Sequence, residues 1–214
     1  MSDVTTNPDH DCPLCPRLVA FRNTYRAISP DWFNGPVPNF GSRDARLLII
    51  GLAPGLQGAH RTGRPFTGDY AGDLLYKSLI KFGFAKGTYQ AHPKDGLQLV
   101  DCLITNAVRC VPPQNKPTPA EISQCRPFLI EVMHQMPRLS HILVLGRVAH
   151  ESFLRACGQA LKAHPFSHGA RHQLDHWILH DSYHCSRYNT QTGVLTTEMF
   201  EAVIGTIRSE LDAK

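Results

Sequence analysis

Short apolar runs alternate with amphipathic segments along this chain. Four of the runs are typical of buried strands, and they cover residues 46–50, 103–108, 141–146 and 177–179. Apolar residues recur at helical spacing after Cys15 and over residues 71–84, 118–136 and 147–157, and again from residue 196 or 197 onward. Strands that alternate with helices predict an α/β protein, a three-layer α/β/α sandwich around a mainly parallel four-stranded sheet.

One helix start is marked by its own local chemistry. Thr118 can cap the helix, Pro119 suits the first helical position, and Glu121 is spaced to complete a capping box. The sequence therefore predicts that a helix begins here.

The longest loop lies between the first buried strand and the helix after it. Residues 51–73 read GLAPGLQGAHRTGRPFTGDYAGD and include six glycines, two arginines and two aspartates. A loop of this length without an apolar pattern is unusual in a compact domain unless it has a function. Loops at the carboxyl ends of parallel strands form the ligand crevice of open α/β sheets, so residues 51–73, 106–113 and 180–189 are expected to converge.

Composition narrows the class of protein. The 214 residues are 42% hydrophobic and 19% charged, which predicts one globular domain over residues 12–214 after a flexible N-terminus of residues 1–11. No apolar run has the length of a membrane span and no signal peptide opens the chain, so we expect a cytoplasmic monomer without a membrane partner. The net charge of +4 permits a polyanionic partner without requiring one.

Two of the seven cysteines have the spacing of half a metal or cluster site. Cys12 and Cys15 form a C-x2-C pair before a helix, which alone could equally be two unrelated thiols. In the cytoplasm an odd number of cysteines favours metal binding or free thiols over a disulfide framework. Cys125 falls on the apolar face of the helix predicted over residues 118–136 and could be a small buried core residue.

These motifs closely resemble the uracil-DNA glycosylase superfamily, specifically its family 5 (B-type) branch with an iron–sulfur cluster. The resemblance rests on GLAPG with RTGRPFTGD, on TNAVRC and on SYHCSRYNTQTG, together with the cysteine spacing, and it extends from Cys12 to the last helix. Cys185 departs from the family, which usually has proline after the histidine, and this should alter the stiffness of that loop. Leu52 fits the B-type branch, because related branches have a polar residue there.

The resemblance implies hydrolytic removal of uracil from DNA and a role for each motif residue. It implies that Asp69 and His184 are catalytic, that Gly51, Ala53, Phe66 and Asn106 bind the base, and that Cys12, Cys15, Cys110 and Cys125 hold a [4Fe–4S] cluster. It also implies that uracil-containing DNA is contacted by Arg61, Arg64, Arg187, Tyr188 and Asn189. Elementary chemistry agrees, because a flipped base needs an aromatic face, an amide to read its edge, a carboxylate and a donor to the leaving base.

Several alternatives stay open at this stage. Phe66 could be a core residue, Asn106 could cap a loop, and Asp73 could complement the helix dipole. A non-catalytic nucleic-acid-binding protein would keep the cysteines and arginines without needing Asp69 or His184. A nucleotide-binding enzyme is disfavoured, because residues 51–73 have neither the G-x-x-x-x-G-K-[ST] nor the G-x-G-x-x-G spacing.

Overall fold

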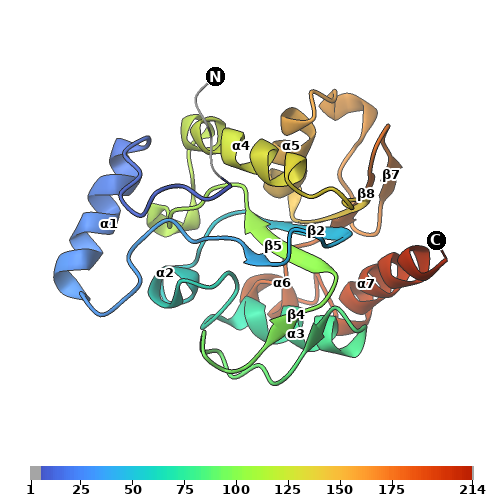
Figure 1. Cartoon of the computed structure of the whole chain (residues 1–214), viewed down its shortest axis with the longest axis horizontal. Coiled ribbons are helices and arrows are strands. Elements are labelled where there is room, and N and C mark those ends of the chain that lie inside the picture. Colours follow the sequence, from blue (N-terminus) through green and yellow to red (C-terminus); the bar gives the residue numbers. More distant parts are fainter. Residues whose placement is uncertain (1–5, 214) are drawn as a thin grey trace.

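A computed structural model describes residues 6–213 as a sheet held between two layers of helices (Figure 1). The sheet has six strands in the order β1-β5-β2-β6-β8-β7. The strands are β1 (Phe40–Gly41), β2 (Leu47–Gly51), β5 (Cys102–Asn106), β6 (His141–Leu145), β7 (Arg171–Gln173) and β8 (Ile178–Ser182).

The four central strands are parallel, which confirms the predicted mainly parallel sheet. The structure adds the short antiparallel edge strands β1 and β7, which pair with β5 and β8. A separate two-stranded sheet consists of β3 (Ala85–Lys86) and β4 (Gln98–Leu99). Two or three residues are too few for a strand pattern to be recognised in the sequence.

Strand β2 is apolar at successive positions because both of its faces are covered. Leu47 and Ile49 pack into one core cluster, whereas Leu48 and Ile50 pack into another. Side chains of a strand alternate between the faces of the sheet, so a strand buried on both sides has no polar face. This explains why an unbroken apolar run marks the centre of the fold.

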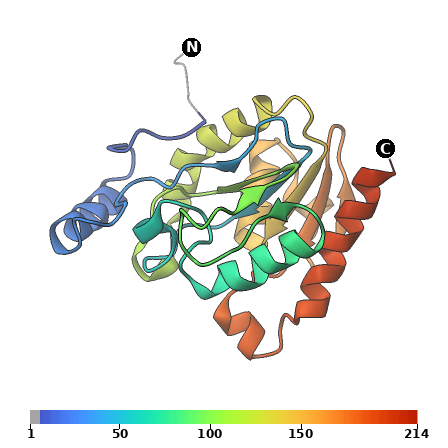
Figure 2. The same ribbon diagram turned by 60° about the horizontal axis from the view of Figure 1, so that its bottom comes forward.

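The two cores are covered by different helices, as Figures 1 and 2 show. Helices α4 (Pro119–His134) and α5 (Arg147–Ala156) cover one face, and α3 (Tyr70–Lys81) and α7 (Thr197–Asp212) cover the other. The remaining helices are α1 (Pro16–Ile28), which projects to one side, α2 (Ala59–Thr62), α6 (Arg187–Gln191) and the 3₁₀ turns at Pro113–Asn115 and Leu161–Ala163.

The predicted capping box at the start of α4 is confirmed. The Thr118 hydroxyl accepts a hydrogen bond from the Glu121 backbone N–H at 3.3 Å, and the Thr118 N–H donates to the Glu121 carboxylate at 2.7 Å. Arg17 of α1 donates to the same carboxylate at 2.7 Å. Glu121 therefore also ties α1 to α4. Across residues 6–213, none of the helices combines the length and the apolar content that a bilayer crossing requires.

The first described residues contact the body of the protein. Thr6 is buried, and its carbonyl accepts a hydrogen bond from Arg109 at 3.1 Å. The Asn7 side chain accepts from the backbone N–H of Asn39 at 2.9 Å. The flexible N-terminus of residues 1–11 stays a prediction, and residues 1–5 lie outside the described range.

Candidate active site and cysteine site

The main pocket lies at the carboxyl ends of the parallel strands. Its volume is about 520 Å³, within the range of ordinary small-molecule sites. Gly51, the last residue of β2, is in register with Asn106, the last residue of β5, so the loops after these strands begin side by side. The loop after β8 contributes His184 to the same pocket. The predicted convergence of the three loops is therefore observed.

Position 51 has room for glycine and for no larger residue. A Cβ atom at this position would lie 2.4 Å from Asn106 Oδ1 and 2.6 Å from Phe66 Cζ. Both distances are shorter than a real Cβ atom tolerates. Gly51 therefore lets an amide and an aromatic ring lie together at the base of the pocket.

The Asn106 side chain lies in the pocket with an unmet hydrogen-bonding capacity. Its residue is only 3% exposed, and its Oδ1 atom is buried without a hydrogen-bond partner. A buried acceptor in this state destabilises the fold by about 1–3 kcal/mol, so such atoms are uncommon outside functional sites. An amide offers an acceptor and two donors, which suits the edge of a base that carries one N–H and one carbonyl.

Phe66 is held in an unusual backbone conformation. Its φ of +51° lies in the left-handed region, which a bulky residue rarely adopts. The Tyr89 hydroxyl donates to its carbonyl at 3.2 Å, and Tyr76 donates to the neighbouring Pro65 carbonyl at 2.5 Å. The Phe66 ring lines the pocket with its centroid 6.0 Å from that of His184. Strain of this kind is characteristic of residues whose position matters for function.

Asp69 lies immediately before α3 and faces the pocket. Its Oδ1 atom is buried without a hydrogen-bond partner, and Gly58 lies so close to Oδ2 that a Cβ there would approach to 2.2 Å. Burial raises the pKa of Asp69, partly offset by the backbone N–H groups of Gly72 and Ala71. Asp73 is exposed and lies outside the pocket lining, in the first turn of α3, where a negative charge complements the helix dipole.

His184 is kept neutral at physiological pH. Burial lowers its pKa to about 4, so the imidazole carries a single N–H. The Asn189 side chain donates to the His184 carbonyl at 2.8 Å and fixes the backbone of this loop. Asn189 therefore holds the loop from within, although it was predicted to contact DNA.

The unusual Cys185 does not reach the surface. It is fully buried in the core beneath α3 and α7, and burial raises its pKa to about 12, so it stays an uncharged thiol. Cys185 therefore packs beneath the loop and presents no group to solvent.

The surface around the pocket carries some of the predicted DNA contacts. Arg61 is exposed and donates to the Gln57 carbonyl at 2.9 Å. Arg187 lines the pocket with its guanidinium 5.3 Å from the Tyr70 ring centroid. Tyr188 is 73% exposed, which is unusual for a large aromatic residue. These side chains are accessible to a large ligand that approaches the pocket.

Arg64 is a correction to the sequence prediction, which placed it on DNA. It is 5% exposed, and its two terminal nitrogens donate to the two carboxylate oxygens of Asp95 at 2.8 and 2.7 Å. Its Nε donates to the Thr67 hydroxyl at 2.7 Å. The Arg64 guanidinium holds the pKa of Asp95 well below its usual range. Arg64 therefore anchors the loop of residues 51–73 to the segment that carries Asp95.

The four predicted cysteine ligands line one small cavity beside α1. Cys12 and Cys15 lie just before α1, Cys110 lies in the segment after β5 and Cys125 lies in α4. Within this cavity the Arg109 N–H donates to Cys125 Sγ at 3.3 Å, and Arg22 approaches Cys110 Sγ at 3.8 Å. Hydrogen bonds to sulfur and nearby positive charge stabilise thiolates, so the cavity is suited to a metal site.

Burial works against ionisation of these thiols when they are not coordinated. It raises the pKa of Cys15 to about 11 and that of Cys110 to about 12. A metal must therefore displace the protons as it binds, and it supplies the charge that the buried thiolates need.

Several residues that line the pocket were not predicted as site residues, and two of them have side chains able to contact a ligand. Tyr70 lies under the Arg187 guanidinium, and Asn115 adopts a left-handed conformation with a φ of +57° at the end of the Pro113–Asn115 turn. Tyr70 directly follows Asp69, so its position next to that acid could have indicated it. Asn115 lies in a proline-rich loop between Cys110 and Cys125, and no sequence motif marks it.

Comparison with known proteins identifies relatives over most of the chain. The uracil DNA glycosylase superfamily matches residues 38–208. A type-5 uracil-DNA glycosylase of Thermus thermophilus is 46% identical over 202 residues and covers 90% of each chain. That of Pyrobaculum aerophilum is 35% identical and covers 91% of this chain and 86% of its own, and that of Mycobacterium bovis is 40% identical and covers 90% and 75%.

The contrast between Arg64 and Arg61 gives a first testable prediction. Arg64→Met leaves Asp95 buried and unpaired, so we expect it to lower the free energy of unfolding by about 3–5 kcal/mol. The exposed Arg61→Met is expected to change stability by no more than about 0.5 kcal/mol. Urea denaturation of both variants measures this difference, and equal stabilities of the two variants would show that the Arg64–Asp95 pair does not support the loop.

Proposed function

The chain belongs to the uracil-DNA glycosylase superfamily, and we propose that it removes uracil from DNA by flipping the nucleotide into the pocket described above. The reaction is hydrolysis of the bond between uracil N1 and sugar C1′, which leaves free uracil and an abasic site. The observation that carries this proposal is that the buried, unpartnered oxygens of Asn106 and Asp69 face one pocket together with the neutral His184.

Asn106 and Phe66 are proposed to capture the base. The Asn106 amide accepts from uracil N3–H and donates to O4, which supplies a partner for its buried Oδ1 atom. The Phe66 ring stacks on the flipped base, since every base presents an aromatic face. Gly51 supports both contacts because a side chain there would displace them, and Ala53 adds a small apolar wall.

His184 is proposed to stabilise the leaving base. As the N1–C1′ bond breaks, both of its electrons move to uracil and negative charge develops on O2. A neutral imidazole N–H directed at O2 stabilises this charge. Because the low pKa keeps His184 neutral, the donor is present throughout the physiological pH range.

Asp69 is proposed to act on the sugar. Its carboxylate stabilises the positive charge of the oxocarbenium-like sugar and orients the water that adds to C1′. The water oxygen bonds to C1′ and its proton leaves, which balances the anion formed on uracil. An exposed carboxylate such as Asp73 lies outside the pocket and cannot take this role.

The phosphates are proposed to lie along Arg61 and Arg187, with Tyr188 entering the base stack. Arginines next to the pocket provide a sequence-independent attraction to DNA. An exposed aromatic side chain on a short loop helix is suited to occupy the space left by a flipped nucleotide. A non-catalytic DNA-binding protein is the alternative, but it gives no reason for two unpartnered buried oxygens in one pocket.

The cysteine site is proposed to hold a [4Fe–4S] cluster with a structural role. Four cysteines that line one cavity provide the four thiolates by which such clusters are held. When bound, the cluster would connect the start of α1 to α4 and to the segment after β5, and no step of the reaction passes through it.

A second prediction concerns the identity of this metal. Anaerobically prepared protein is expected to contain iron and to absorb broadly near ~400 nm, as thiolate-ligated clusters do. Metal analysis and the absorption spectrum test this, and replacement of Cys110 by serine should reduce both signals together. Stoichiometric zinc without iron would overturn the cluster assignment and leave the proposed catalytic pocket untouched.

A third prediction tests the assignment of the acid. Asp69→Asn is expected to lower the single-turnover rate of uracil excision by on the order of 10²-fold or more, because a positioned charge is lost next to the sugar. Binding to an uncleavable uracil analogue in DNA should be unchanged or slightly tighter. Asp73→Asn is the matched control and should retain the wild-type rate; an inactive Asp73→Asn with an active Asp69→Asn would reverse the assignment.

A fourth prediction follows from the sign of the pKa shift at Asp69. Because the folded state raises this pKa above 3.8, ionisation of Asp69 destabilises the fold, and stability falls as the pH rises through the folded-state pKa. Asp69→Asn should therefore raise Tm at neutral pH, and the gain should disappear as the pH falls toward 3.8. Thermal unfolding at a series of pH values measures this. A lower Tm for Asp69→Asn at neutral pH would contradict the raised pKa.

A further inference from the structure

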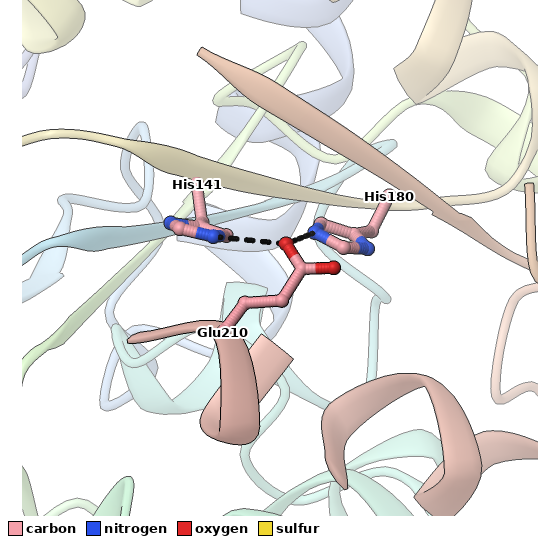
Figure 3. Close-up of side chains that lie close together, drawn as sticks. All are labelled: His141, His180 and Glu210. Atoms are coloured by element: carbon pink, nitrogen blue, oxygen red, sulfur yellow. Dashed lines mark hydrogen bonds and ion pairs between the residues drawn. The ribbon is translucent and has the colours of Figure 1, made fainter. Parts of the chain in front are cut away.

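Two histidines and a glutamate meet on the sheet face beneath α7, as Figure 3 shows. His141 is the first residue of β6, His180 lies in β8, and Glu210 lies near the end of α7. His180 is in register with Leu143, two residues after His141, so both imidazoles project from the same face of the sheet. The proposed catalytic residues follow the opposite, carboxyl ends of the strands.

The spacing of the three side chains matches a metal site. Glu210 Oε2 lies 3.3 Å from His141 Nε2 and 3.7 Å from His180 Nε2, and the three atoms all lie within 4.8 Å of one another. Ligands of tetrahedral zinc, bound at about 2.0–2.1 Å, are separated by about 3.4 Å. The two imidazoles are stacked, with centroids 5.7 Å apart.

His180 supplies an independent sign that a ligand is missing. Its side chain is 3% exposed, and its Nε2 atom is buried without a hydrogen-bond partner. The distance of 3.7 Å to Glu210 Oε2 is too long for a hydrogen bond. A cation between His180 Nε2 and the Glu210 carboxylate would bind both atoms and supply the partner that His180 lacks.

We propose that His141, His180 and Glu210 bind a divalent transition metal ion, with Zn²⁺ as the representative. Two imidazoles and one carboxylate are a common protein ligand set for zinc. Glu210 is 25% exposed, so a water molecule can reach the fourth position from its side. The carboxylate offsets part of the charge of the ion in an otherwise buried setting.

Neighbouring groups orient two of the three ligands. Arg171 donates to Glu210 Oε1 at 2.9 Å, which leaves Oε2 for the metal. The Ser140 hydroxyl lies 2.9 Å from His141 Nδ1, so it can accept a hydrogen bond from Nδ1–H. His141 Nε2, which lies at hydrogen-bond distance from Glu210 Oε2, would then direct its lone pair at the metal. Such hydrogen bonds from outside the ligand set are typical of protein metal sites.

A second group on the opposite side of β8 shows what a satisfied network looks like. His150 Nδ1 lies 2.7 Å from Asp181 Oδ1 and its Nε2 lies 2.8 Å from the His164 carbonyl. His172 Nε2 lies 3.2 Å from Asp181 Oδ2. Each of these nitrogens already has a partner, so hydrogen bonding explains this group and it serves as the control.

The site would connect the end of α7 to β6 and β8. These three elements are far apart in the sequence, and a shared ion holds them in one arrangement. The metal site includes the amino end of β6, whereas the pocket lies at the carboxyl ends of the strands. Zinc binding should therefore change stability and leave the single-turnover rate of excision unaffected.

The experiment titrates Zn²⁺ into the protein with its cysteine site loaded and follows Tm. When free Zn²⁺ exceeds its dissociation constant about 100-fold, linkage predicts a Tm increase of roughly 5–10 °C. His180→Gln and Glu210→Gln should each abolish this increase. His172→Gln, the same type of change in the control group, should retain it. The two variants at the site are independent, so failure of one to fold leaves the test intact.

X-ray absorption at the zinc edge gives a second readout. Zinc at the proposed site has nitrogen and oxygen neighbours at about 2.0–2.1 Å, whereas zinc bound to cysteines shows sulfur at about 2.3 Å. The proposal is overturned by the absence of a Zn²⁺-dependent rise in the wild type, by a rise that persists in both site variants, or by sulfur neighbours. None of these outcomes bears on uracil excision.

Discussion

The parallel pairing of β2 with β5 on one side and β6 on the other is the constraint on which the rest of the structure depends. It buries both faces of β2, which separates the two cores, and it aligns the ends of the strands. Gly51 and Asn106 meet because they end neighbouring strands in register. The pocket is thus a consequence of sheet topology, and the loops add their chemistry to an edge that already exists.

The pocket is maintained by residues that never touch it. Arg64, in the loop of residues 51–73, forms a buried ion pair with Asp95, 31 positions later, and two tyrosine hydroxyls from outside the loop bond to the carbonyls of Pro65 and Phe66. A loop with so many partners around it has little freedom to collapse into the pocket. This explains how unpartnered groups such as Asn106 Oδ1 can persist there.

The features that the sequence revealed are those with local causes. The apolar run of β2 and the capping box of α4 follow from neighbouring residues, and the convergence of three loops follows from the parallel sheet. Arg64 was misplaced because its partner Asp95 is distant in sequence, and arginines in a polar loop look alike before folding. The contact between Thr6 and the buried Arg109 likewise joins residues that are far apart in the sequence. A periodic pattern of apolar residues carries no information about which polar residues, far apart in the sequence, will pair in the fold.

Burial acts on the acid and the imidazole of the pocket in opposite directions. It raises the pKa of Asp69 and lowers that of His184, because in both cases the charged form is the one that loses water. For His184 this shift is compatible with the proposed chemistry, since the neutral imidazole keeps one N–H that can donate to the leaving base. For Asp69 it opposes the charged form that its proposed role requires. The pocket therefore keeps the Asp69 carboxylate although its burial lowers the stability of the fold. A destabilising residue of this kind is expected where function requires it.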